Sequence, residues 1–254
     1  DAEPTLTNSS NNTSDASGLY ASTDTNTGKP TYYFRGNVTN NYVKFAGFTW
    51  RIVRVNEDGT IRIVMQDGIN IAFNSNYNNY TYMYYTNSQA KTTLESWYQT
   101  NIGSKSDLAK NVASGAYYCE QAKVKVGDSA TSGSDTMTTY NKYTPDFKCS
   151  SDGNGKGVVN ASVGLLTYDE VVYAGGYYAQ NNNNYYLYNN TYFWTMSPAG
   201  FSGSNSYVWI VYAAGYIYRS SVDDPSIRLR PVIILNADTL ATGTGTSSDP
   251  FVIQ

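Results

Sequence analysis

Two short runs decide the expected fold of this chain: Tyr207-Val208-Trp209-Ile210-Val211 and, after a break at Gly215, Tyr216-Ile217-Tyr218. Aliphatic residues alternate in both runs with large aromatic ones, and this period of two is typical of half-buried strands. If Val208, Ile210 and Ile217 face the core, the aromatic residues between them face outward. The pattern therefore predicts a strand pair with an aromatic outer face.

Clustered outward-facing aromatic side chains are typical of a binding surface, because tyrosine and tryptophan offer a large amphipathic contact area at a low cost in conformational entropy. We expect a ligand to bind at Tyr207, Trp209, Tyr216 and Tyr218. The loops 200–206 and 220–224 form the expected rim, with polar contacts from Ser204, Asn205 and Asp223. The alternative is that the aromatic side chains pack beneath the tyrosine-rich loop 177–190 and contact no ligand.

The composition excludes several classes of function. Of 254 residues, 26 are tyrosine and none is histidine, 15% are charged, and the formal net charge is −3. Such a chain lacks the basic surface that nucleic acid requires, and it has no apolar run near the roughly twenty residues of a membrane span. Without histidine there is no Ser-His-Asp or Cys-His catalysis and no His-ligated zinc. We expect an extracellular protein that is not an enzyme and holds no cofactor.

Acidic residues offer few catalytic or metal-binding alternatives. Asp169 and Glu170 are adjacent at an expected helix start, so they point in different directions and mostly interact with the helix dipole. Asp223 and Asp224 lie in an expected loop, where their spacing leaves a paired acid–base site open without requiring one. Residues 152–155 resemble half of a calcium loop, but Lys156 and Gly157 follow, so the fifth ligand and the distal glutamate are missing. We interpret the segment as a turn and expect no metal.

Cys119 and Cys149 are the two cysteines of the chain. Their even number and the expected extracellular setting favour a disulfide, which would close a segment rich in Gly, Ser, Thr and Asp. The alternative is a pair of free buried thiols. A catalytic thiol would have no histidine or cationic cluster to activate it.

The N-terminal part of the sequence predicts a tether followed by a domain. Residues 1–29 contain almost no apolar side chain, so we expect a disordered tether there and a single domain over 30–254. Strands are predicted over 31–34, 42–45, 48–55 and 60–65, with a hairpin turn at 56–59.

Two helices and two further strands are also predicted. One helix covers 90–101, is capped by Thr92, Thr93 or Ser88, and ends at Gly103. The other begins with a capping box of Thr167 and Glu170 and ends at Gly175-Gly176. A short buried strand is expected at 163–166, and a closing strand follows a turn near the C-terminus, at 249–253.

The C-terminal motifs carry a family resemblance. The order of four motifs resembles the C-terminal half of the C-type-lectin-like fold. In chain order they are Trp194, Ser197-Pro198, the strand pair around Gly215 and Arg230-Pro231-Val232. The similarity is to the branch shared by formylglycine-generating enzymes and the variable proteins of diversity-generating retroelements. Segments 32–36, 48–54, 164–170 and 249–251 resemble surface proteins of Gram-positive gut bacteria, many with a pilin-like leader helix. The resemblance covers residues 31–254. It implies an α+β fold with mixed, mainly antiparallel sheets, about two short helices and long loops.

The resemblance also shapes the expected function. No cysteine follows Cys149 and no Glu-Pro-Asn/Asp calcium motif is present, so neither the oxidase activity nor calcium-dependent sugar binding is expected. The resemblance implies an exported, adhesin-like module on a bacterial surface that binds an unknown host or bacterial protein or glycan. A pilin-like filament subunit that self-assembles, or a degenerate carbohydrate-active enzyme, is the alternative. Active diversification of the aromatic face by a retroelement stays open.

Overall fold

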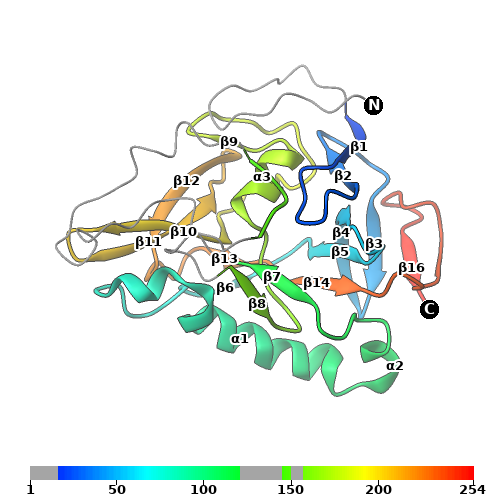
Figure 1. Cartoon of the computed structure of the whole chain (residues 1–254), viewed down its shortest axis with the longest axis horizontal. Helices are drawn as coiled ribbons and strands as arrows, with labels where there is room; N and C mark the ends of the chain where they lie inside the picture. The colour runs from blue at the N-terminus through cyan, green and yellow to red at the C-terminus, as the bar shows by residue number, and fades with distance from the viewer. Residues whose placement is uncertain (1–16, 121–144, 150–156) are drawn as a thin grey trace.

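The computed structural model describes residues 17–120, 145–149 and 157–254, which form two large sheets with short helices around them (Figure 1). The architecture is mixed α+β, as expected. The sheet built mostly from the first third of the chain, here the N-terminal sheet, lies beside the C-terminal sheet that contains the strand pair around Gly215.

The N-terminal sheet contains the strands predicted between residues 31 and 65. Its order is β1-β2-β4-β3-β16-β15, and β5 pairs with both β4 and β14. The strands are β1 (Gly18–Ser22), β2 (Thr31–Arg35), β3 (Tyr42–Phe45), β4 (Phe48–Val55), β5 (Ile61–Met65), β14 (Val232–Leu235), β15 (Ala241–Thr242) and β16 (Phe251–Ile253). The predicted turn after β4 is confirmed, since the Gly59 N–H donates to the Asn56 carbonyl at 2.9 Å and Gly59 adopts a φ of 85°.

The predicted tether is partly wrong. Residues 1–16 lie outside the described residues, but β1 falls within the predicted tether and pairs antiparallel with β2. Tyr20 of β1 is buried and stacks on Tyr33 of β2, with ring centroids 5.8 Å apart. Backbone pairing and one buried aromatic ring hold this polar segment on the sheet, although its composition alone offers little apolar surface.

The C-terminal sheet has the order β6-β13-β10-β11-β12-β9. Its strands are β6 (Ile69–Asn70), β9 (Tyr177–Tyr178), β10 (Phe193–Ser202), β11 (Asn205–Val211), β12 (Tyr216–Ser221) and β13 (Arg228–Leu229). A separate antiparallel pair consists of β7 (Tyr117–Cys119) and β8 (Val158–Asn160). The predicted strand 163–166 is buried but pairs as an isolated bridge from Gly164 to Val232.

Both predicted helices are present. Helix α1 (Gln89–Tyr98) is capped by Ser88, whose hydroxyl accepts from the Lys91 N–H, and a π-helical turn (Gln99–Gly103) and α2 (Ser106–Ala109) follow it. Helix α3 (Tyr168–Ala174) begins with the predicted capping box and ends at Gly175, where φ is 123°. Two 3₁₀ turns, η1 (Tyr80–Met83) and η2 (Tyr85–Asn87), precede α1.

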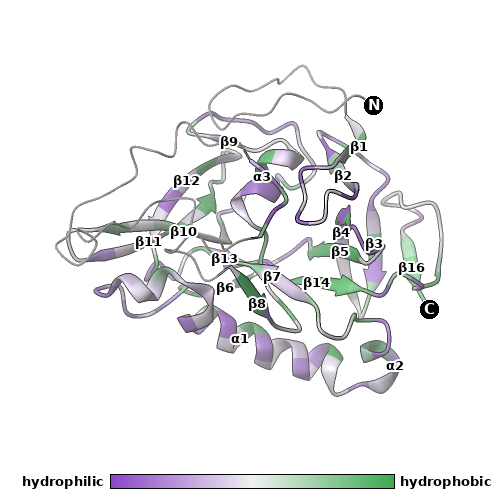
Figure 2. Cartoon of the chain, viewed as in Figure 1, coloured by the Kyte–Doolittle hydropathy of each residue, from purple (hydrophilic) through white to green (hydrophobic). Residues whose placement is uncertain are grey.

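One hydrophobic cluster joins the two sheets. It includes Trp50 of β4, Trp194 of β10 and the whole of β14, which is buried and apolar along its length (Figure 2). Among the helices of the described ranges, none combines the length and apolar character that crossing a membrane requires.

Candidate functional site

The predicted orientation of Trp209 is wrong. Its side chain is 0% exposed, and all four residues from Val208 to Val211 are buried, so both faces of this part of β11 are covered. Tyr168 of α3 packs edge-on against the indole at 5.3 Å between ring centroids, and Tyr178 of β9 packs against it at 5.9 Å. Trp209 is therefore a core residue, because the N-terminal end of α3 covers the face that the alternation marks as exposed.

The predicted single aromatic face is also wrong. In the β11–β12 pair, Trp209 stands opposite Arg219 and Ile210 stands opposite Tyr218. Directly opposite residues of an antiparallel pair share a face. Tyr216 and Tyr218 thus lie on the face of Ile210, whereas Tyr207 and Trp209 lie on the other face.

The predicted residues separate into two groups along these strands. Tyr207 is half-buried beneath the Arg219 guanidinium at 4.5 Å, near the end of β11 that carries Ser204 and Asn205. Asp223 belongs to this end as well, because it accepts a hydrogen bond from Ser221, which is paired with Tyr207. The opposite end of β11 is about 20 Å away at 3.3 Å per residue, so these residues do not share a site with Tyr216.

Tyr216 and Tyr218 belong to a group of rings that the strand alternation does not predict. Tyr212 stacks on Tyr216 at 4.5 Å between centroids and meets Tyr192 edge-on at 5.1 Å. Tyr218 lies edge-on to Tyr212 at 6.3 Å. We call this set the tyrosine ladder: Tyr192, Tyr212, Tyr216 and Tyr218. Tyr192 is the most open member, with 42% of its surface exposed.

An open groove of about 530 Å³ adjoins the tyrosine ladder. It is lined by Asn181, Asn183, Tyr188, Asn190, Tyr192, Ala213 and Ala214. The three asparagines are exposed, and their side-chain amides make no hydrogen bond to any residue of the described ranges. We call this surface the Tyr/Asn groove. It presents aromatic rings beside amide donors and acceptors.

Gly215 fixes the asparagine loop against the strand pair. A Cβ atom at Gly215 would stand 1.7 Å from the Asn182 carbonyl oxygen, and the residue has a φ of 82°. The Tyr185 hydroxyl donates to the Gly215 carbonyl at 3.0 Å. The glycine that the sequence marked as a strand break therefore permits the loop to approach the ladder.

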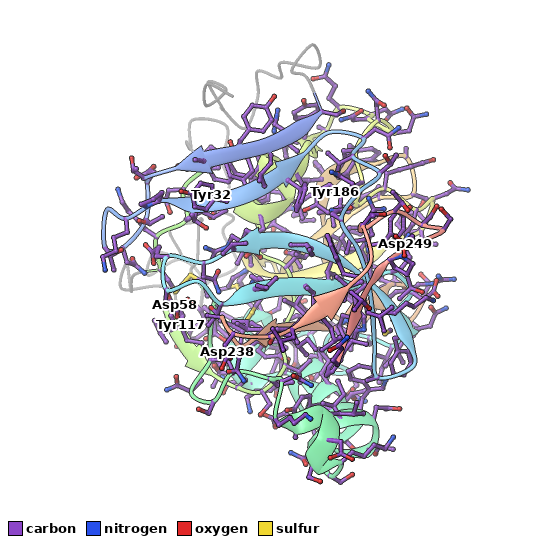
Figure 3. All side chains as sticks on the ribbon, turned by 90° about the vertical axis from the view of Figure 1, so that its right-hand side faces the viewer. Tyr32, Asp58, Tyr117, Tyr186, Asp238 and Asp249 are labelled. Carbon is purple, nitrogen blue, oxygen red and sulfur yellow. A yellow bond between two sulfur atoms is a disulfide. The ribbon has the colours of Figure 1, made fainter. Side chains whose placement is uncertain are left out.

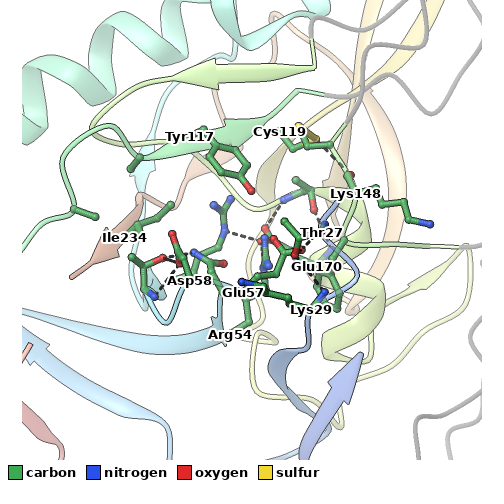
Figure 4. A pocket seen from close by; sticks show the side chains of 18 of the residues that line it. Thr27, Lys29, Arg54, Glu57, Asp58, Tyr117, Cys119, Lys148, Glu170 and Ile234 are labelled. Atoms are coloured by element: carbon green, nitrogen blue, oxygen red, sulfur yellow. Dashed lines mark hydrogen bonds and ion pairs between the residues drawn. A yellow bond between two sulfur atoms is a disulfide. The ribbon is translucent and has the colours of Figure 1, made fainter. Parts of the chain in front are cut away.

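A second, more enclosed site has a cavity of about 330 Å³ between the N-terminal sheet, α3 and the 145–149 segment. Arg54 of β4, Arg62 of β5 and Glu170 of α3 line its interior. Asp169 of α3 and the N-cap residue Thr167 also line it. We call it the charged cavity (Figure 4).

A β-bulge places the two arginines together. The β4–β5 register shifts between Ile52 and Arg54, so Arg54 stands directly opposite Arg62. Such a bulge inserts one extra residue and re-aims the side chains that follow it. Glu170 contacts both cations through one oxygen, with Oε1 at 3.2 Å from Arg54 Nε and 2.6 Å from Arg62 Nε.

The other Glu170 oxygen completes the capping box by accepting from the Thr167 N–H at 2.9 Å. The sequence pattern predicts Glu170 at the helix start, and the ion pairs add a second role. Burial lowers the pKa of the Arg54 guanidinium, while the Glu170 carboxylate acts in the opposite direction. This buried cluster depends on strands and a helix that are far apart in sequence.

The expected disulfide between Cys119 and Cys149 is present, and both residues line the charged cavity. The Cys149 N–H donates to the Asn26 side chain at 3.0 Å, which joins the 145–149 segment to the β1–β2 connection. Asp58 in the β4–β5 turn and Tyr117 in β7 lie on the same side of the molecule (Figure 3) and both line this cavity.

The described part of the chain contains no group of three or more Cys, Asp or Glu side chains that could hold a metal ion. The segment 152–155, which resembles half of a calcium loop, lies outside the described residues. Comparison with family models, with curated proteins and with solved structures found no match to this chain.

Proposed function

We propose that this chain is an exported bacterial surface module of the C-type-lectin-like class that binds a ligand at the Tyr/Asn groove. The observation that supports it best is the tyrosine ladder beside three exposed asparagine amides. Trp209 has no part in this site because it is buried.

The chemistry of the groove favours an uncharged glycan. A sugar ring has an apolar face that packs on an aromatic ring, and hydroxyl groups that need both donors and acceptors. Each asparagine amide supplies both, and tyrosine combines an apolar ring with a polar hydroxyl. The residues that line the groove carry no charge, so a charged ligand would gain no ion pair there.

Prior ordering of the groove adds to the expected affinity. The rings of Tyr212 and Tyr216 are already stacked, and the Tyr185–Gly215 hydrogen bond anchors the asparagine loop. A preformed surface loses less conformational entropy when it binds.

An extracellular location is consistent with the disulfide, since such bonds persist in oxidising compartments. The adhesin-like role rests on this location together with the groove. A filament subunit would instead use the same exposed rings for contacts between copies of the chain.

A glycan array probed with the labelled chain tests the proposal, with each hit titrated by calorimetry. We expect binding of neutral glycans that weakens about tenfold or more in Tyr192→Ala and in Asn190→Ala, since each removes about one stacking or hydrogen-bonding contact. The matched control is Tyr80→Ala, because Tyr80 is similarly exposed at 38% and lies outside the groove. Unchanged affinity in both groove variants would overturn the assignment of the site.

A further inference from the structure

We propose that the charged cavity is a second ligand site, separate from the Tyr/Asn groove, that takes a small molecule through its carboxylate group. An amino acid or the C-terminus of a short peptide fits this description best. The proposal rests on unused hydrogen-bond donors inside the cavity, on its size and on the charges at its mouth.

The two guanidiniums keep hydrogen-bond donors that no described residue uses. Arg54 donates to Glu170 and, through Nη1, to the Thr31 hydroxyl at 3.2 Å. Arg62 contacts Glu170 and donates from Nη2 to the Leu165 carbonyl at 3.3 Å. Within the described ranges, Arg54 Nη2 and Arg62 Nη1 have no acceptor. Guanidinium donors recognise carboxylates with high geometric specificity.

Like charges directly opposite each other in a sheet are destabilising. Arg54 and Arg62 are opposite each other and share a single oxygen of Glu170, whose other oxygen is occupied by the Thr167 N–H. A ligand carboxylate would supply the pair with a further anion. Buried ionisable clusters in a cavity are typical of functional sites.

Tyr117 adds a donor on the opposite wall. Its hydroxyl is directed toward the interior of the cavity (Figure 4) and has no hydrogen-bond partner among the described residues. Tyr117 is 40% exposed, so its ring can adjust to a bound molecule. The hydroxyl and the two guanidiniums approach the same space from different elements.

The charges at the mouth of the cavity favour a particular chemical group next to the carboxylate of the ligand. Glu57 and Asp58 line it together with Lys29 and Lys148, and the Lys148 ammonium is already paired with Asp24. Glu57 and Asp58 each have one oxygen occupied, by Thr27 and by Thr60 respectively. Their remaining oxygens attract an ammonium group. A ligand with a carboxylate inside and an amino group at the mouth matches this charge pattern.

The size of the cavity limits the ligand to a small molecule. About 330 Å³ lies at the lower end of the range of small-molecule pockets, roughly 300–1,000 Å³. That volume suits an amino acid or dipeptide and is too small for a polymer chain that passes through. A sugar acid is the other small source of a carboxylate, and the experiment separates the two.

The test is ligand-detected saturation-transfer NMR on the full chain, followed by calorimetry. The probes are the common amino acids, glycyl-leucine and glucuronate. The controls lack the carboxylate: leucinamide and glycyl-leucinamide are capped as amides, and glucose is uncharged. We expect saturable binding of one or more amino acids or of the dipeptide. The matching amide should bind at least about tenfold more weakly, because it lacks a charge-assisted hydrogen bond. Binding of glucuronate alone would support a carboxylate site but overturn its assignment to amino acids and peptides.

Variants separate a ligand site from a structural ion-pair network. Tyr117→Phe should lower the affinity for the carboxylate ligand by about threefold to tenfold, because it removes one hydrogen bond. The melting temperature should not change. Tyr80→Phe, outside the cavity, should change neither, and Tyr192→Ala should leave carboxylate binding intact. Arg54→Gln should abolish binding if the variant folds. Absence of binding by every carboxylate, equal binding of the amides, or no effect of Tyr117→Phe would each overturn the proposal.

Discussion

Arg54 and Arg62 stand directly opposite each other on β4 and β5, and one oxygen atom of Glu170 lies within 3.2 Å of both guanidiniums. The three side chains are 12%, 3% and 3% exposed. Two buried cations on neighbouring strands repel each other, and the carboxylate from α3 offsets that repulsion. The position of α3 on the N-terminal sheet is thus tied to an electrostatic requirement of that sheet.

The first prediction concerns the shared carboxylate. Glu170→Gln should lower the free energy of unfolding by roughly 3–5 kcal/mol, because removing one partner of a buried ion pair leaves uncompensated charge. The amide keeps the size of the side chain, so packing is nearly unchanged. Urea unfolding followed by circular dichroism measures the effect.

The matched control is Glu95→Gln on α1. Glu95 forms an i,i+4 pair with Lys91 and is 42% exposed, so we expect a change below about 0.5 kcal/mol. Equal effects of the two substitutions would contradict the role assigned to Glu170.

The second prediction distinguishes core from surface aromatic residues. Trp209→Ala should cost roughly 3–5 kcal/mol, since it opens a cavity against Tyr168 and Tyr178. Tyr192→Ala should cost only about 0.5–1.5 kcal/mol, because 42% of Tyr192 is exposed and the variant loses mainly the edge-on ring contact to Tyr212. Thermal and urea unfolding of both variants give the comparison. If the Trp209 variant were as stable as the parent, the result would contradict burial of Trp209 and support an exposed side chain.

The third prediction concerns the disulfide. Its removal in the double variant Cys119→Ser and Cys149→Ser should lower stability by on the order of 3–4 kcal/mol, since the bond closes a long loop in the unfolded chain. Urea unfolding of the parent with and without reductant should give a similar difference. Alkylation of both thiols in the folded, unreduced protein, detected by intact-mass spectrometry, would show that the bond does not form.

The fourth prediction is a loss of stability at alkaline pH. Burial raises the pKa of Tyr85, Tyr118, Tyr168, Tyr185 and Tyr186 above the ordinary tyrosine value. In the unfolded chain these phenols have pKa values of about 10. The folded state therefore binds more protons above about pH 10. The stabilisation that the protonated phenols provide is complete below about pH 10. It is lost as the pH rises through the tyrosine pKa values of the folded state.

Arg230 acts in the opposite direction. Burial lowers its pKa to about 10, so its unfavourable contribution diminishes as the pH rises from there toward the unfolded value. Burial also lowers the pKa of Arg51 and Arg54. The five tyrosines outnumber these three arginines, so the free energy of unfolding should fall above about pH 10. Urea unfolding at several pH values, with tyrosinate absorbance as a second signal, measures this. Full ionisation of every tyrosine near pH 10 in a still-folded protein would contradict it.

The amino-acid sequence by itself determined the local structure. The capping box of Thr167 and Glu170, the turn ending at Gly59 and the Ser88 cap of α1 are all as predicted or among the predicted options. Each of these depends on backbone geometry and on hydrogen bonds between residues at most four positions apart. Such interactions are fixed by neighbouring residue types.

Only the tertiary structure decided which side chains are exposed and which come together. Alternation marked Trp209 as exposed, but α3 and β9 cover it. A one-residue bulge in β4 placed Arg54 opposite Arg62, and Glu170 reaches Arg54 from 116 positions away. A strand's alternation defines its two faces but not what packs on each. Burial, register and charge pairing between distant segments arise only when those segments meet in the folded chain.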